Sequence, residues 1–115
     1  MGRSQRTKGA TGEREVVAAL QARGHHSRRT APMQTGYGGT HGDADVAGLP
    51  GYHIEVKRQE ALSLDKWSAQ AEADASVTGN VPLVVYRRSR QPWRVALTLD
   101  AFLDLYELAH GKDPA

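Results

Sequence analysis

The chain has 115 residues, of which 39% are hydrophobic and 24% are charged. This length supports one domain with a single core and is too short for two. No apolar run approaches the roughly 18 residues that span a bilayer, and the absence of cysteine excludes disulfides and thiolate metal sites. No apolar segment typical of a secretory signal follows the basic N-terminus, so we expect a cytoplasmic protein.

The net charge of +2 conceals an uneven distribution. Residues 1–42 hold seven Lys and Arg against two Glu, whereas the remaining 73 residues hold eight basic and eleven acidic residues. Basic side chains that neutralise phosphates supply most of the non-specific affinity for nucleic acids. The basic N-terminal third therefore suggests a polyanionic partner, and an ordinary solvated surface is the alternative.

We predict a flexible basic arm over residues 1–8, followed by a single domain over 9–112. The first element of this domain is a helix over 10–23. This helix is indicated by apolar residues at helical spacing, and Gly24 is a suitable stop. The further elements are a short strand over 25–30, a glycine-rich loop over 31–42, strands over 43–48 and 52–59, a helix over 63–77, strands over 81–87 and 93–98, and a helix over 99–110.

This order of elements predicts an α/β fold with a mixed central sheet flanked by helices. The tight turn Leu49-Pro50-Gly51 makes a hairpin of the second and third strands, and Ser63 is a suitable N-cap for the second helix. The last helix carries an apolar stripe formed by Leu99, Phe102, Leu103 and Tyr106. Leu105 and Leu108 lie off that stripe and are candidates for a dimer face.

The strand over 52–59 carries different side chains on its two faces. Alternation places Ile54 and Val56 towards the core, and Glu55 and Lys57 on the opposite face. An acid and a lysine separated by one residue are common on exposed strands. Taken alone, this pattern identifies no site.

The hairpin brings a second carboxylate to this face. If Gly48 pairs with Tyr52 across the turn, Asp45 lies directly opposite Glu55. Like charges that face each other destabilise a strand pair, and a bound cation explains their placement. Oxygen ligands of this kind suit Mg²⁺, with Mn²⁺ as the alternative.

Glu13 is a candidate third acid of the same site. Val16, Val17 and Leu20 follow it at i+3, i+4 and i+7, so its carboxylate points towards the core side of the first helix. Acids that face a core are usually paired or bound to metal. The alternative is an ordinary acid in a first helical turn, where the helix dipole favours it.

Several motifs, taken together in chain order, carry a resemblance to a known family. They are KGATGERE at 8–15, the pair Arg28-Arg29, Asp45-Val46-Ala47-Gly48, and Ile54-Glu55-Val56-Lys57. In this order they resemble archaeal-type Holliday junction resolvases of the PD-(D/E)xK nuclease superfamily, over roughly residues 8–98. The segments EALSLDKWSAQAEADA and PLVVYRRSRQPW also resemble small phage-encoded nucleases of this superfamily.

The resemblance implies a restriction-endonuclease-like fold and a Mg²⁺-dependent endonuclease of a bacterial, archaeal or phage-infected cell. Such an enzyme acts as a homodimer on branched DNA, cuts opposed strands of a four-way junction, and needs no small-molecule cofactor. The implied catalytic residues are Glu13, Asp45, Glu55 and Lys57, and the implied metal ligands are Asp45, Glu55, Glu13 and the Val56 carbonyl. The implied DNA-binding residues are Arg14, Arg28 and Arg29, joined by Arg6 and Lys8 of the basic arm, and the resemblance to the phage nucleases adds Gln70 as a supporting residue. Asp43 departs from the family pattern and is a further candidate support, because it offers a second acid on the strand face of Asp45.

Other hypotheses stay open at this point. The chain is either a junction resolvase, a nuclease of the same superfamily with nicking, mismatch-directed or restriction-like specificity, or a non-catalytic DNA-binding module on the same fold. The turn that carries Arg87, Arg88, Arg90 and Arg94 either follows a DNA backbone or is simply solvated. The spacing of His25, His26, His41 and His53 fits no closed zinc site, so zinc is not expected.

Overall fold

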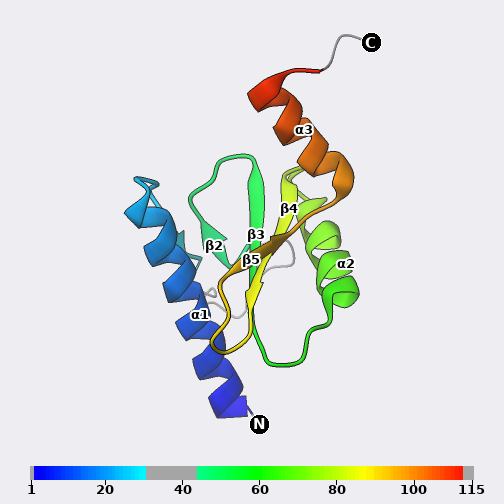
Figure 1. Cartoon of the computed structure of the whole chain (residues 1–115). Coiled ribbons are helices and arrows are strands. Elements are labelled where there is room, and N and C mark those ends of the chain that lie inside the picture. Colours follow the sequence, from blue (N-terminus) through cyan, green and yellow to red (C-terminus); the bar gives the residue numbers. More distant parts are fainter. Residues whose placement is uncertain (1, 31–43, 113–115) are drawn as a thin grey trace.

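The computed structural model describes residues 2–30 and 44–112, and for residues 2–7 it describes the backbone alone. Its elements are α1 (Gly2–Ala22), β1 (Arg28–Arg29), β2 (Val46–Ala47), β3 (Tyr52–Arg58), α2 (Leu64–Ala75), β4 (Val81–Arg87), β5 (Arg94–Ala96) and α3 (Leu99–His110). Figure 1 shows a central sheet with α1 and α2 on either side of it. The predicted α/β class and the predicted order of elements are confirmed.

The five strands form one mixed sheet in the order β1-β2-β3-β4-β5. Every neighbouring pair is antiparallel except β3 and β4, which run parallel from Tyr52 opposite Val81 to Arg58 opposite Arg87. A parallel pair needs a crossover connection, and α2 supplies it. The strand with the predicted acid and lysine therefore lies in the middle of the sheet, buried on both faces.

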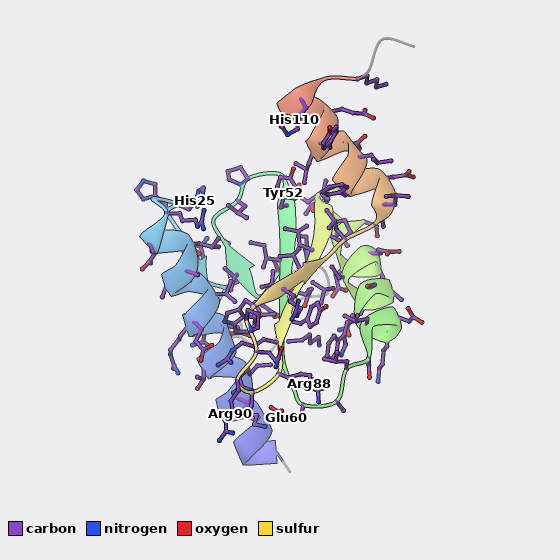
Figure 2. The ribbon with its side chains drawn as sticks, viewed as in Figure 1. His25, Tyr52, Glu60, Arg88, Arg90 and His110 are labelled. Carbon is purple, nitrogen blue, oxygen red and sulfur yellow. The ribbon has the colours of Figure 1, made fainter. Side chains whose placement is uncertain are left out.

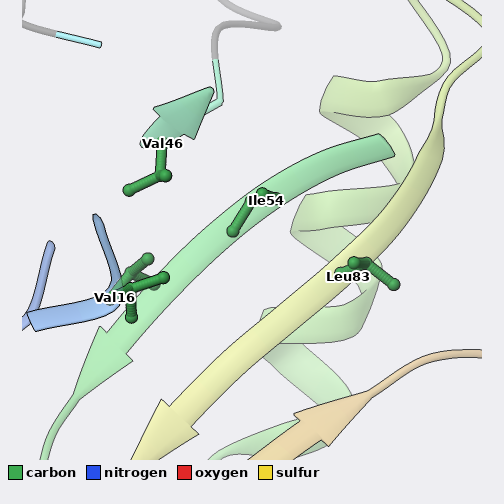
Figure 3. Packing of buried hydrophobic residues seen from close by; sticks show 5 residues of the cluster. Val16, Val46, Ile54 and Leu83 are labelled. Atoms are coloured by element: carbon green, nitrogen blue, oxygen red, sulfur yellow. The ribbon is translucent and has the colours of Figure 1, made fainter. Parts of the chain in front are cut away.

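Helices α1 and α2 cover opposite faces of the sheet. Val16 of α1 packs with Ile54 and Leu83 in one cluster of buried residues, which Figure 3 shows from close by. Trp67 of α2 packs with Val84 in the other cluster. Because neighbouring strand residues point to opposite faces, the face of β3 that carries Glu55 is the one turned towards α2.

The hairpin between β2 and β3 has the predicted register. Val46 lies opposite Ile54, which is the pairing expected from the turn. The N–H of Tyr52 donates to the Leu49 carbonyl at 3.0 Å, and Gly51 has a φ of +90°, a conformation that favours glycine. Continuing this register by one residue places Asp45 opposite Glu55.

Helix α1 differs from the prediction at its N-terminal end. The backbone is helical from Gly2, so residues 2–8, expected as an arm, continue the helix. Extending an existing helix needs no new nucleus, and this stretch contains no proline to stop it. The C-terminal end agrees with the prediction, because the helix ends at Ala22 and Gly24 adopts a φ of +90°.

Strands β1, β2 and β5 are clearly shorter than expected. β1 pairs only with the two residues of β2, and β5 pairs only along Arg94–Ala96. Ser63 occupies the N-cap of α2 as predicted, but its side chain makes no capping hydrogen bond. At α3, by contrast, the N-cap is satisfied, because the hydroxyl of Thr98 accepts a 3.0 Å hydrogen bond from the Ala101 N–H.

Helix α1 also forms hydrogen bonds with the hairpin between β4 and β5, more than 70 residues later in the sequence. The Glu15 carboxylate accepts hydrogen bonds at 3.1 Å from the Arg87 guanidinium and from the Trp93 indole N–H. The same guanidinium lies over the Trp93 ring, 5.5 Å from its centroid. This contact holds α1 against the β4–β5 hairpin, and it explains the packing role of a tryptophan in a turn region.

Helix α3 projects from the body of the protein (Figure 1) and contains no buried residue. Its apolar stripe is largely exposed, from Leu99 at 70% to Leu103 at 40%. Leu105 and Leu108, the candidate dimer residues, are also exposed. Within residues 2–30 and 44–112, no helix has the length and apolar character needed to cross a membrane.

Candidate active site

The structure brings Asp45 and Glu55 together between two adjacent strands. The Asp45 N–H donates to the Ile54 carbonyl at 2.9 Å, and the Asp45 carboxylate accepts a hydrogen bond from the Val56 N–H at 2.8 Å. Glu55, one residue earlier on β3, is only 6% exposed. The backbone of β3 therefore holds the Asp45 carboxylate against the strand that carries the second acid.

Both acids are poorly solvated and close to each other. Burial and, second to it, the negative charge of Glu55 together raise the pKa of Asp45 to about 6, against the opposing effect of the Val56 N–H. Burial also raises the pKa of Glu55. A pair of this kind is stabilised by a proton or a cation between its members, because either one relieves the repulsion.

Glu13 reaches the same region from α1. Its carboxylate accepts a 3.0 Å hydrogen bond from Nε of Arg29, and burial raises its pKa despite that contact. The charge of Asp45 acts in the same direction, so the two carboxylates are near neighbours. Glu13 therefore lies beside the hairpin acids, as its position on the first helix predicted, while its catalytic role stays a prediction.

A cleft of about 660 Å³ opens beside these acids. Its lining residues come from α1, β3 and the loop after β3, and they are Lys8, Gly9, Glu13, Asp45, Val56, Lys57, Arg58, Gln59, Glu60 and Ala61. A cavity of similar size, about 640 Å³, lies at the turn end of the β2–β3 hairpin, and neither Asp45 nor Glu13 lines it. We assign the chemistry to the first cleft because Glu13 and Asp45, both with raised pKa values, line it.

Gly12 allows α1 to approach the sheet closely enough to form this cleft. A Cβ atom at Gly12 would lie 2.9 Å from Cβ of Arg58 and 3.5 Å from a Val56 methyl group. Any side chain at this position would push α1 away from β3 and take Glu13 with it. The glycine of the KGATGERE motif thus has a packing function next to the acid that follows it.

Two residues near Glu55 were not predicted as part of the site. Nε2 of His53 lies 2.6 Å from Oε2 of Glu55, and His53 is only 2% exposed. Asp74 of α2 completes a group whose possible ligand atoms all lie within 4.8 Å of one another. Alternation along β3 does place His53 on the face of Glu55, but Asp74 is brought there only by the docking of α2, which sequence spacing does not reveal.

The residues predicted to bind DNA are in different situations. Arg14 and Arg28 are exposed, whereas Arg29 is bonded to Glu13 at 3.0 Å and Lys8 lies 3.9 Å from Glu60. The side chain of Arg6 is not described. Gln70 is exposed on α2 and is not among the residues that line the cleft, and Asp43 and His41 lie outside the described residues.

Comparison with known proteins agrees with this geometry. A family model described as "Phage putative PDDEXK endonuclease" matches residues 4–113. One similar solved structure is that of Hjc, a Holliday junction resolvase from the archaeal hyperthermophile Archaeoglobus fulgidus. Its TM-score is 0.56 at 25% sequence identity, and the match covers 78% of this chain and 72% of that one. No curated protein matches the chain. The chain therefore belongs to the family of phage PDDEXK endonucleases and has the PD-(D/E)xK nuclease fold predicted from its motifs.

Proposed function

We propose that this protein is a divalent-metal-dependent DNA endonuclease that resolves four-way junctions by paired phosphodiester hydrolysis. The observation that carries the metal-dependent chemistry is the opposition of Asp45 and Glu55 across β2 and β3, next to Lys57 in the cleft. The junction preference is supported by the likeness to a Holliday junction resolvase. Such an enzyme acts in DNA recombination or repair, in the cytoplasm of a bacterial, archaeal or phage-infected cell.

The donor set fits a hard divalent cation. Asp45, Glu55 and Glu13 provide carboxylate oxygens whose raised pKa values show that each lacks sufficient solvation for its charge. Mg²⁺ and Mn²⁺ prefer such oxygens, and Val56, whose carbonyl is a further candidate ligand, lines the same cleft. When bound, the cation would polarise the scissile phosphate and lower the pKa of an attacking water.

The side chains of the chain itself supply the remaining functions. Asp45 is held in place by the Val56 N–H, so its carboxylate is preorganised to bind the cation. The Lys57 ammonium is placed to orient the attacking water or to stabilise negative charge that develops on the phosphate. Arg29 holds Glu13 in the cleft, which leaves Arg14 and Arg28 as the exposed arginines among the described side chains of the predicted DNA-binding set.

We further propose that the active form is a homodimer. Two opposed strands of a junction need two active sites, and a symmetric pair of subunits provides them. The exposed apolar residues of α3, with Phe102 at 50% and Leu108 at 84%, form an interface of suitable character for a second copy.

Cleavage of matched substrates tests this function. A synthetic four-way junction and a linear duplex of the same sequence are incubated with the protein in Mg²⁺, with EDTA and Glu55→Gln as controls. Glutamine keeps the shape of Glu55 and a partner for His53, so loss of cleavage reports on charge rather than on folding. Paired nicks confined to the junction support the resolvase, and cleavage of both substrates supports a nuclease of other specificity. Binding without cleavage in any divalent metal would make the chain a DNA-binding module.

A further inference from the structure

Glu60, in the loop between β3 and α2, is surrounded by hydrogen-bond donors from three parts of the chain. Oε2 of Glu60 lies 3.0 Å from Nη1 of Arg58 and 3.9 Å from Nζ of Lys8. Ser89, in the turn between β4 and β5, donates its hydroxyl to the same oxygen at 2.7 Å and its backbone N–H at 3.2 Å. We call the donor groups of Lys8, Arg58 and Ser89 the carboxylate cradle.

The cradle has the composition of a phosphate-binding site. It combines a guanidinium, an ammonium, a hydroxyl and a backbone N–H, which are the groups that commonly bind DNA phosphates. The hydrogen bonds from Ser89 and the contact with Arg58 lower the pKa of Glu60, which shows that the cradle favours an anion. The Glu60 side chain is itself 49% exposed, so an incoming anion can reach the site.

A structural role alone explains this arrangement poorly. Exposed ion pairs usually contribute little to stability, because solvent screens the charges and the long side chains lose conformational entropy. Lys8 is 48% exposed and contacts Glu60 at 3.9 Å, a distance that adds little to folding. Its position in the lining of the cleft is more suitable for contact with a ligand.

The cradle is continuous with the proposed active site. Lys8, Arg58 and Glu60 line the same cleft as Asp45 and Lys57. Figure 2 shows Arg88 and Arg90 beside Glu60, at the end of the molecule opposite His110, and both arginines are exposed. A DNA strand bound at the acids would therefore continue over the cradle and towards the basic turn.

We propose that the cradle is a binding subsite for a phosphate of the DNA backbone, and that the Glu60 carboxylate occupies it until DNA displaces it. This rests on the proposed function in that the ligand is DNA. Glu60 then competes with the substrate within the same molecule. Its removal strengthens DNA binding, whereas loss of a cradle donor weakens binding.

The experiment measures DNA binding by fluorescence anisotropy of a labelled four-way junction in EDTA, where no cleavage occurs, over a series of KCl concentrations. We expect Glu60→Gln to tighten binding by about threefold at low salt, and Arg58→Ala to weaken it and to reduce the salt slope by about one. The matched controls are Glu107→Gln and Lys112→Ala, because Glu107 and Lys112 form a similar exposed ion pair at 3.8 Å on and just after α3.

The control variants separate the outcomes. Glu60→Gln and Glu107→Gln change the net charge equally, so an equal effect of the two on binding overturns the subsite and leaves only a general charge effect. A change in melting temperature without a change in affinity also overturns it and leaves a structural ion-pair cluster. If the wild type binds no DNA, the proposed function fails and the subsite fails with it. If the wild type cleaves the junction normally and Glu60→Gln leaves DNA binding unchanged, the subsite is overturned and the proposed function stands.

Discussion

The Val56 N–H donates a 2.8 Å hydrogen bond to the carboxylate of Asp45. One strand thus presents Glu55 and Lys57 and, through its own backbone, fixes the acid that faces them. This bond holds the Asp45 carboxylate close to Glu55, and without a bound proton or cation the candidate active site therefore carries electrostatic repulsion.

The first prediction is that the stability of the metal-free protein depends on the pH through Asp45. The pKa of this group is about 6 when folded and 3.8 in its ordinary environment, so the folded state binds the proton more tightly. The free energy of unfolding consequently falls as the pH rises from about 4 to about 6, by roughly 3 kcal/mol at most.

Urea denaturation in EDTA across this pH range measures the effect. We expect Asp45→Asn, which keeps an oxygen for the Val56 N–H, to show a shallower fall than the wild type. Parallel profiles of the two proteins would show that Asp45 titrates normally.

The second prediction is that Mg²⁺ or Mn²⁺ stabilises the fold by relieving the same repulsion. A cation at 100 times its dissociation constant adds about 2.7 kcal/mol to stability, which thermal unfolding detects. Glu55→Gln should lose most of this gain. Asp104→Asn, a change of an exposed acid on α3, should keep it, and an equal gain in all three proteins would argue against a site at Glu55.

The third prediction concerns Lys57. We expect Lys57→Ala to slow single-turnover cleavage by about 10²-fold or more, since its charge acts in the transition state. Its positive charge lowers the pKa values of Asp45 and Glu55 and would repel a cation, so calorimetry should find Mg²⁺ binding unchanged or tighter. A parallel loss of metal binding would assign Lys57 to the structure of the site.

The fourth prediction compares two glycines of α1. Gly12→Ala places a methyl group 2.9 Å from Cβ of Arg58 and should cost about 1–3 kcal/mol of stability, with slower cleavage as Glu13 moves. Gly9→Ala meets nothing within 4 Å and should stabilise the helix by about 0.5–1 kcal/mol. Chemical denaturation of both variants provides the comparison, and equal effects would exclude close packing at Gly12.

The fifth prediction tests the α3 interface. Phe102→Asp introduces a charge into the exposed apolar surface and should convert a dimer to a monomer in light scattering, without loss of helix content. The monomer should nick a junction once instead of cutting it in pairs. A variant that stays dimeric would place the interface elsewhere, whereas a monomeric wild type would remove the dimer from the proposal.

Local patterns were sufficient to predict the hairpin and its acid pair. The turn at Leu49-Pro50-Gly51 determines the register, and the register determines which residue faces Glu55, so no tertiary information was needed. The contact of His53 with Glu55 could have been predicted in the same way, because alternation along β3 places both side chains on one face.

The contacts missed by the sequence analysis depend on tertiary packing. Asp74 reaches Glu55 only because α2 crosses over between two parallel strands, and Ser89 reaches Glu60 across 29 positions of sequence. The start of α1 was also missed, because residues 2–8 carry no apolar side chains at helical spacing and the helix simply continues into them from its packed part.

The bond between Glu15 and Trp93 has a consequence for synthesis on the ribosome. Glu15 is two residues from Glu13, and its Trp93 partner lies 78 positions later, so α1 gains this contact only when most of the chain has been made. A nascent polypeptide that ends before β5 already has both hairpin acids and the β3 residues against which Val16 and Gly12 of α1 pack, but it lacks the bond to Trp93. Helix α1 is therefore expected to be held less firmly against the sheet until translation is nearly complete.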